Sequence, residues 1–93
     1  MDITHEQSNG VAVLALHGRL DELATRDAEA TFQDVIDNGP RQVVLDLTGV
    51  EYVSSSGLRV LVMLLRGLQK HAGVLKVCGL SPFVAEVFEV SNL

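Results

Sequence analysis

Three consecutive serines, Ser54, Ser55 and Ser56, precede Gly57 at the expected start of a helix. A serine oxygen can cap a helix, because it accepts hydrogen bonds from N–H groups that lack a partner at a helix N-terminus. A phosphoserine also suits this position, since those N–H groups and the positive end of the helix dipole stabilise an anion. The serine run therefore indicates either a structural cap or a phosphorylation site.

The helix expected from Ser56 to Ala72 carries a candidate docking surface beside these serines. Each residue of a helix is rotated by about 100° from the one before it. Six residues then share an apolar side that is expected to be core: Leu58, Leu61, Val62, Leu65, Leu68 and Ala72. A mixed patch is expected at the surface: Ser56, Arg59, Val60, Met63, Arg66 and Gly67. This patch is either a partner-contact surface or an ordinary solvated helix face.

Catalytic and metal chemistry find little support elsewhere in the chain. The serine run lacks the Gly-x-Ser-x-Gly pattern of a serine-hydrolase elbow. His5, His17 and His71 have neither triad partners nor metal-ligand spacing, and there is no Walker-type loop. The single cysteine, Cys78, lies in an apolar run and is expected to be a small buried thiol. The sequence thus predicts a protein that is not an enzyme and uses no metal or cofactor.

Size and charge restrict the candidate partners. The chain has 93 residues, enough for one small domain, and its formal net charge is −5. An acidic surface repels phosphate backbones and anionic lipids, so nucleic acid and membranes are poor candidates. The longest apolar stretch, Val60 to Leu65, is too short to span a bilayer. A lone cysteine and no secretory leader favour the cytoplasm.

The apolar runs and turn residues predict an α/β domain with the order β-β-α-β-α-β-α. Strands are expected at residues 2–7, 11–16, 43–47 and 74–78, and helices at 22–37, at 56–72 and from 81–82 onward. Asn9-Gly10 predicts a hairpin turn between the first two strands. Strands separated by helices predict parallel pairing after that hairpin.

The segments between these elements carry their own expectations. Gly18–Asp21 is expected to end the second strand, with Asp21 capping the first helix. Gly39 is expected to close that helix as a left-handed cap before Pro40. Thr48–Ser55 is expected to be a loop, and Ser81 is expected to cap the last helix.

Three segments resemble a known family. Val44–Leu58 resembles the signature of bacterial anti-sigma factor antagonists, which are STAS-domain proteins, and Gly18–Asp21 matches that family's second motif. Gly73–Phe88, with Cys78 and Ser81-Pro82, resembles its later strand and helix. The resemblance implies one STAS domain over residues 1–93, with a mixed, mostly parallel sheet packed against helices.

The resemblance also implies a partner-switching cycle. An anti-sigma factor that is a serine kinase phosphorylates the antagonist and releases it, and a PP2C-type phosphatase removes the phosphate. The unphosphorylated antagonist binds the kinase and frees a sigma factor. The implied phosphoacceptor is Ser56, with Ser55 as the alternative, and Asp21 matches an acidic residue near the kinase contact. The expected partner-binding residues are Asp21, Ser54, Ser55, Ser56, Gly57, Arg59, Val60, Met63 and Arg66, on a monomer or weak dimer.

Two departures from the family pattern leave an alternative open. The best-known pattern has aspartate where this chain has Ser54. The chain also stops at Ser91-Asn92-Leu93, where relatives usually continue into another strand and helix, so we expect a short member or a truncated chain. The alternative function is a STAS scaffold or accessory subunit of a signalling or transport complex, in which the serines only cap a helix.

Overall fold

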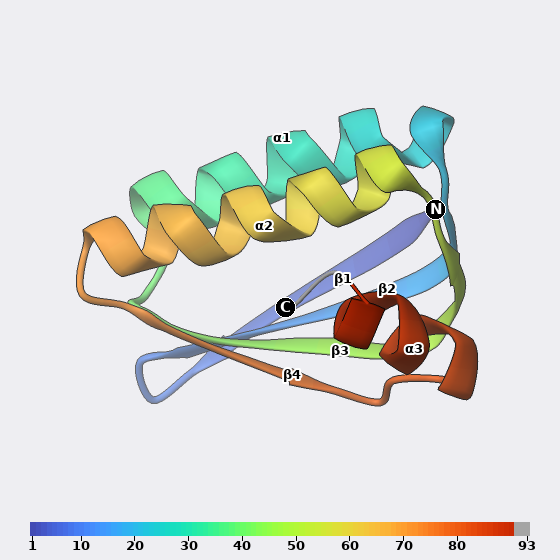
Figure 1. Ribbon diagram of the computed structural model, residues 1–93. Coiled ribbons are helices and arrows are strands. Elements are labelled where there is room, and N and C mark those ends of the chain that lie inside the picture. Colours follow the sequence, from blue (N-terminus) through green and yellow to red (C-terminus); the bar gives the residue numbers. More distant parts are fainter. Residues whose placement is uncertain (91–93) are drawn as a thin grey trace.

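The computed structural model describes residues 1–90 as four strands and three helices (Figure 1). In chain order these elements are β1 (Asp2–Ser8), β2 (Val11–Leu20), α1 (Glu22–Asn38), β3 (Gln42–Val53), α2 (Ser55–Lys70), β4 (Val74–Cys78) and α3 (Pro82–Val90). The predicted order β-β-α-β-α-β-α is therefore confirmed. The expectation about the chain end at Ser91–Leu93 lies outside the described residues.

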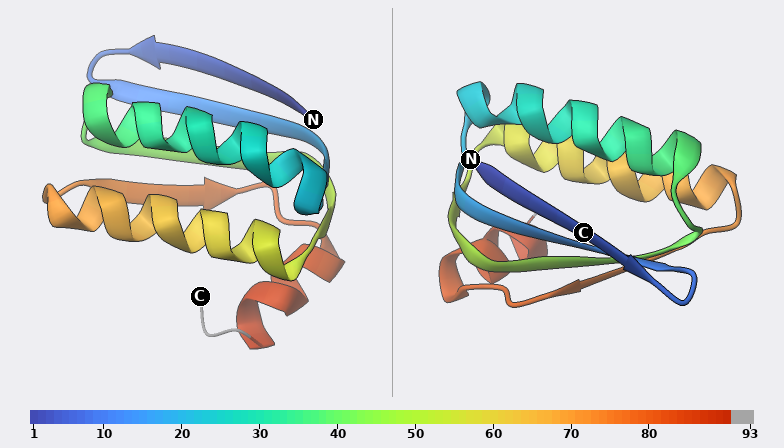
Figure 2. Two further views of the ribbon diagram at one scale, coloured as in Figure 1. Left: turned by 90° about the horizontal axis from the view of Figure 1, so that it is seen from above. Right: turned by 180° about the vertical axis from the view of Figure 1, so that it is seen from behind.

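The sheet is mixed and has the spatial order β1-β2-β3-β4. β1 is antiparallel to β2, whereas the pairs β2–β3 and β3–β4 are parallel. α1 and α2 lie side by side on one face of the sheet, and α3 lies near the ends of β3 and β4 (Figures 1 and 2). β2 and β3 are parallel, so they finish at the same end of the sheet. Because α1 follows β2 and α2 follows β3, both helices begin at that end.

The β1–β2 hairpin follows the local turn chemistry. Asn9 and Gly10 both have positive φ, at 53° and 78°. Two successive residues of this kind are what a two-residue hairpin turn between twisted strands requires. The predicted hairpin is confirmed, with Ser8 paired to Val11 across the turn.

β2 and β3 are longer than the sequence pattern predicts. β2 continues through Gly18 to Leu20, and β3 occupies most of the segment that was expected to be a loop at 48–55. Their pairing shifts register between Ala15 and His17 and again after Gly18, where φ is 123°. These irregularities interrupt the regular alternation of apolar residues, which is why the sequence pattern ends the strands too early.

The core lies between the sheet and the two long helices. The expected α1 stripe is buried and gains one residue: Ala24, Ala28, Phe32, Val35 and Ile36. On α2 the expected face is wrong in part, because Val60 and Leu64 are buried whereas Ala72 is exposed in the turn after the helix. α2 packs against α1 as well as the sheet, which turns its buried side toward α1.

Two further expectations about local structure are wrong. Cys78 is exposed, because it alternates with Val77 on an edge strand and faces away from the helices. Gly39 ends α1 without a left-handed conformation, at φ −89°, and a Cβ there would lie 2.6 Å from the Val35 carbonyl oxygen. Close approach of the chain to Val35, not positive φ, is what favours glycine at this position.

α3 follows its predicted N-cap. The Ser81 hydroxyl oxygen accepts a hydrogen bond of 3.2 Å from the Val84 N–H, and Val84 is fully buried. Phe83 stacks on Tyr52 of β3, with ring centroids 6.0 Å apart. These contacts fasten α3 to the end of the sheet. None of the helices within residues 1–90 is long and apolar enough to cross a membrane.

Candidate functional site

The first helix begins with an aspartate cap at the end of β2. The Asp21 carboxylate accepts a hydrogen bond of 3.0 Å from the Ala24 N–H, and Asp21 itself has extended backbone angles. The Thr25 hydroxyl donates to the Asp21 carbonyl oxygen at 2.8 Å. The expected capping role of Asp21 is confirmed, and Glu22 adds a second acid in the first turn.

The second helix begins with a serine cap at the end of β3. The Ser54 hydroxyl oxygen accepts a hydrogen bond of 3.0 Å from the Gly57 N–H. The same hydroxyl donates to the Leu20 carbonyl oxygen at 3.1 Å, and the Ser54 N–H donates to that oxygen at 2.9 Å. Ser54 therefore caps α2 and ties its start to the end of β2.

The hydroxyl of Ser56 contacts this cap directly. Its Oγ lies 3.0 Å from the Ser54 Oγ. Because Ser54 directs its one hydroxyl hydrogen to the Leu20 carbonyl oxygen, Ser56 is the donor in this pair. Ser56 is partly buried and Ser55 is exposed. The three serines therefore have different places: Ser54 is the N-cap of α2 and bonds to Leu20, whereas Ser55 and Ser56 lie in the first turn of the helix.

Gly57 and Val60 are structural residues, which corrects their expected place on the partner surface. Both are buried, and Val60 is only 3% exposed. A Cβ on Gly57 would lie 2.5 Å from the Leu20 carbonyl oxygen, so α2 can approach β2 this closely only with glycine there. The packing of α2 against α1 and the sheet, which the sequence does not contain explicitly, leaves both residues with little exposed area.

An open hollow of about 500 Å³ lies between the starts of α1 and α2. We call it the cap hollow, and it is lined by Asp21, Glu22, Leu23, Tyr52, Ser54, Ser55 and Ser56. The topology therefore brings together Asp21 and the serine run, which lie more than thirty residues apart in the sequence. A partner in this hollow would contact fixed carboxylates on one side and hydroxyls on the other.

The cap hollow includes two residues that the sequence analysis missed. Leu23 is 81% exposed in the first turn of α1, and its place in the cap hollow makes it a candidate contact. Tyr52 forms a wall, held between the Arg19 guanidinium, 4.3 Å from its ring centroid, and Phe83. The sequence did contain a signal for Leu23, because this leucine falls outside the apolar stripe of α1 and should therefore be exposed.

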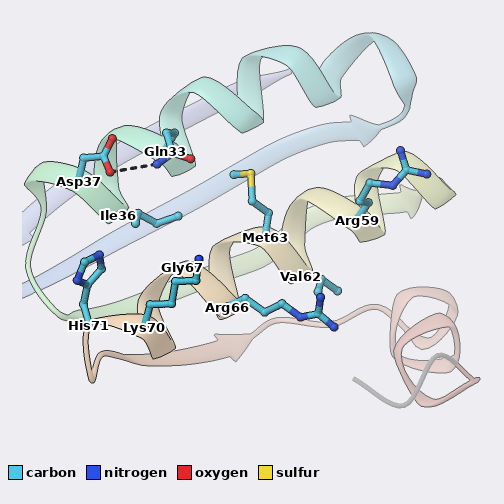
Figure 3. A pocket seen from close by; sticks show the side chains of 10 residues that line it. All are labelled: Gln33, Ile36, Asp37, Arg59, Val62, Met63, Arg66, Gly67, Lys70 and His71. Carbon is cyan, nitrogen blue, oxygen red and sulfur yellow. Dashed lines mark hydrogen bonds between the residues drawn. The ribbon is translucent and has the colours of Figure 1, made fainter.

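The remaining expected partner residues lie along α2, outside the cap hollow. Arg59 and Arg66 are exposed, and Met63 is partly buried against the core. They line the seam between α1 and α2, and Figure 3 shows Met63 pointing into that seam. The structure thus separates the predicted patch into the serine run, two buried residues and a seam that leads away from the serines.

One carboxylate on the opposite face of the sheet has a shifted pKa. The Thr48 hydroxyl and the Thr48 N–H both donate to Asp46 Oδ1, at 2.6 and 2.9 Å. These two bonds, with a smaller contribution from nearby His17, lower the pKa of Asp46 below its usual value. Within the described 90 residues, no group of three or more His, Cys, Asp or Glu side chains is arranged to bind a metal ion.

The sequence of the whole domain matches one protein family. The family described as "Mlab, STAS domain" matches residues 3–93. The chain belongs to the STAS-domain family. BtrV of Bordetella bronchiseptica, which bears the name of an anti-sigma factor antagonist, is 37% identical over 92 residues. That alignment covers 99% of this chain and 79% of BtrV.

Solved structures share this STAS fold. An anti-sigma factor antagonist from Mycobacterium paratuberculosis has a TM-score of 0.88 at 25% identity, over 98% of this chain and 77% of that one. Unphosphorylated SpoIIAA gives 0.80 at 22% identity, over 95% and 82% of the two chains. Phosphorylated Bacillus SpoIIAA gives 0.82 at 23% identity, over 99% and 85%. The predicted family and fold are confirmed.

Proposed function

We propose that this protein is an anti-sigma factor antagonist that is switched by phosphorylation of Ser56. When unphosphorylated, it binds an anti-sigma factor that is also a serine kinase, through the cap hollow. The kinase transfers the γ-phosphoryl group of ATP to the Ser56 oxygen, whose proton is lost, and a PP2C-type phosphatase later hydrolyses the ester. The names carried by relatives such as BtrV support the antagonist role.

The observation that carries the proposal is that Ser54 already caps α2, which leaves Ser55 and Ser56 as acceptors, and the family resemblance favours Ser56. The Ser54 oxygen already takes part in three hydrogen bonds, to Gly57, Leu20 and Ser56. Modifying it would remove the α2 cap and its link to β2. Ser56 gives up only its single bond to Ser54. Ser55 is exposed and remains the alternative acceptor.

A phosphate on Ser56 is compatible with the fold. Losing one exchangeable hydrogen bond costs about 1 kcal/mol, and an anion at a helix N-terminus regains about 0.3–1 kcal/mol. The fold of SpoIIAA, which this chain shares, exists in both unphosphorylated and phosphorylated forms. The two effects nearly cancel, so the phosphate is expected to change recognition rather than unfold the domain.

A phosphate on Ser56 changes the hollow that the partner contacts. Asp21 and Glu22 line the same hollow as Ser56, so a dianion placed there adds to an existing negative surface. A partner that fits the unmodified hollow must then accommodate the extra volume and remove water from the dianion. Phosphorylation is therefore expected to release a partner that contacts the cap hollow, through steric conflict and the cost of desolvating the phosphate.

The test uses the host's purified anti-sigma factors with radiolabelled ATP. We expect one of them to label the wild-type protein and Ser55→Ala, but not Ser56→Ala, while Ser56→Ala still binds that kinase. Leu23→Ala, in the same hollow, should weaken binding about tenfold or more without destabilising the fold. Labelling that persists in Ser56→Ala and disappears in Ser55→Ala would move the acceptor to Ser55. Stable binding to a partner that is not a kinase, without any labelling, would favour the scaffold alternative.

A further inference from the structure

α2 is a basic helix in an acidic protein. Between Ser55 and Lys70 it carries Arg59, Arg66 and Lys70 but no aspartate or glutamate. The whole chain, by contrast, has 12 acidic and 7 basic residues. Neighbouring α1 carries five acids and one cation, Arg26, along its length, so most of the positive charge of the two helices lies on α2. A surface whose sign opposes that of the whole protein points to a partner of complementary charge.

A groove of about 670 Å³ runs between α1 and α2 along this basic helix. Its apolar lining comes from Ile36, Val62 and Met63, and its cations are Arg59, Arg66 and Lys70, with His71 at the far end. Figure 3 shows Met63 directed into the space between the helices and Lys70 reaching back toward Gly67. The groove therefore combines an apolar floor with positive flanks.

The α1 side of the groove offers few competing charges. Among the described residues that line it, Asp37 is the only carboxylate. That carboxylate accepts a hydrogen bond of 3.0 Å from the Gln33 amide, four residues earlier on α1 (Figure 3). An internal donor thus already engages the one acid of the lining, and the arginines and lysine of α2 face solvent.

The groove reaches the proposed phosphorylation site. A second hollow of about 210 Å³ on the same seam is lined by Ser56, Arg59, Met63, Val60, Thr25 and Glu29. It shares Arg59 and Met63 with the larger groove. The two hollows therefore share part of their walls, and together their lining residues extend from His71 to Ser56, a span of about 22 Å at 1.5 Å per residue.

We propose that this groove binds an acidic amphipathic helix of the anti-sigma factor, which deepens the proposed function and rests on it. The apolar face of such a helix packs on Met63 and Ile36, and its carboxylates pair with Arg59, Arg66 and Lys70. A methionine suits this role because its flexible thioether adapts to different side chains. About three helical turns match the length between Arg59 and His71.

The position of Arg59 couples this contact to the switch. Arg59 lines both the groove and the hollow that contains Ser56. A phosphate on Ser56 competes with the bound carboxylates for Arg59 and repels the acidic helix along its N-terminal portion of the groove. Phosphorylation then weakens two contacts at once, one in the cap hollow and one along α2.

The test compares two charge-reversed proteins that have the same net charge. Arg66→Glu/Lys70→Glu alters the groove at the end away from Ser56, and Arg26→Glu/Lys76→Glu alters exposed cations on α1 and β4 outside it. Each is titrated with the host anti-sigma factor that labels the wild-type protein, after thermal melting confirms folding. We expect the groove pair to weaken binding roughly 10–100-fold and the control pair by less than about threefold.

Other outcomes overturn the proposal in distinguishable ways. Equal weakening in both pairs would mean that overall charge, not the groove, guides binding. If the groove pair binds the kinase and is labelled on Ser56 like the wild-type protein, the proposed acidic helix is wrong and the proposed function still stands. If no anti-sigma factor of the host binds the wild-type protein, the groove proposal and the proposed function fail together.

Discussion

The starts of α1 and α2 are built alike but differ in charge. Each follows a parallel strand, and each is capped by a side-chain oxygen that accepts from the N–H three residues later. The four residues from the cap onward are Asp21-Glu22-Leu23-Ala24 in α1 and Ser54-Ser55-Ser56-Gly57 in α2. The start of α1 has two fixed acids, whereas α2 has no acid in its first turn and three hydroxyls instead.

The start of α1 carries permanent negative charge, whereas the start of α2 carries neutral hydroxyl groups. The positive end of the α1 dipole already has Asp21 and Glu22 beside it. The equivalent end of α2 has neutral hydroxyls, and within residues 1–90 the hydrogen bonds include none donated by the N–H groups of Ser55 and Ser56. The start of α1 is therefore permanently negative, whereas the start of α2 is neutral and, under the proposed function, receives the phosphate.

The largest expected effect comes from the fourth position of each start. Gly57→Ala should destabilise the fold by about 2–3 kcal/mol, because the added methyl meets the Leu20 carbonyl oxygen 2.5 Å away. The matched change in α1, Ala24→Gly, should cost less, about 1–2 kcal/mol, through helix propensity and the loss of one buried methyl group. Urea unfolding of both variants measures the difference. Equal losses of stability would show that the close contact between Gly57 and Leu20 does not require glycine.

The second largest expected effect is a difference in stability between variants that lack the α2 cap and variants that lack the α1 cap. Ser54→Ala should lower the free energy of unfolding by about 1–2 kcal/mol, since it removes the α2 cap and the hydroxyl bond to Leu20. Asp21→Ala should cost about 1 kcal/mol, because it removes a cap without a comparable long-range bond. Asp21→Asn, which retains a capping oxygen, is the control and should change stability by less than about 0.5 kcal/mol. A larger loss for Asp21→Ala than for Ser54→Ala would contradict this account.

The first position of α2 should be nearly silent for stability. Ser55 is exposed and makes no side-chain hydrogen bond among those found in residues 1–90. Ser55→Ala should therefore change the free energy of unfolding by less than about 0.5 kcal/mol. Chemical denaturation checks this value beside that of Ser54→Ala. A cost above 1 kcal/mol would give Ser55 a structural role that the geometry does not support.

The smallest expected effect concerns Asp46, a carboxylate in β3 that accepts hydrogen bonds from an N–H and a hydroxyl group without lying at a helix end. Thr48→Val removes the hydroxyl donor to Asp46 and should raise the pKa of that carboxyl toward its ordinary value, as followed by NMR titration. Because the folded-state pKa of Asp46 is lowered, its stabilising contribution is present above the ordinary pKa of 3.8 and is lost as pH falls through the lowered value. Thr48→Val should lose less stability over that acidic range. An unchanged pKa would assign the shift to the Thr48 N–H alone.

The local features of the site could be predicted from the sequence, whereas its surface could not. Asp21, Ser81 and the serine run have capping chemistry that depends on a few neighbouring residues. The burial of Val60 depends on α1 lying beside α2, and the exposure of Cys78 depends on its register in an edge strand. These are tertiary facts, and periodicity within a single segment does not contain them.

The cap hollow illustrates the same limit more directly. Its two sides come from segments that only the parallel order of β2 and β3 brings together. Leu23 was therefore not recognised as a candidate contact, although its exposure is evident once α1 is placed. The family resemblance selected Ser56 among the three serines; the hydrogen bonds of Ser54 argue against Ser54 as the acceptor and do not distinguish Ser55 from Ser56.

The central claim, that Ser56 is a reversible phosphate acceptor, is tested most directly on protein isolated from its own cells. Intact mass followed by phosphosite mapping should find a fraction with a single phosphate, carried on Ser56. Treatment with a PP2C-type phosphatase should remove it and restore binding to the anti-sigma factor. A phosphate found on any residue other than Ser56, or a protein that never carries one while the anti-sigma factor is active, would contradict the account.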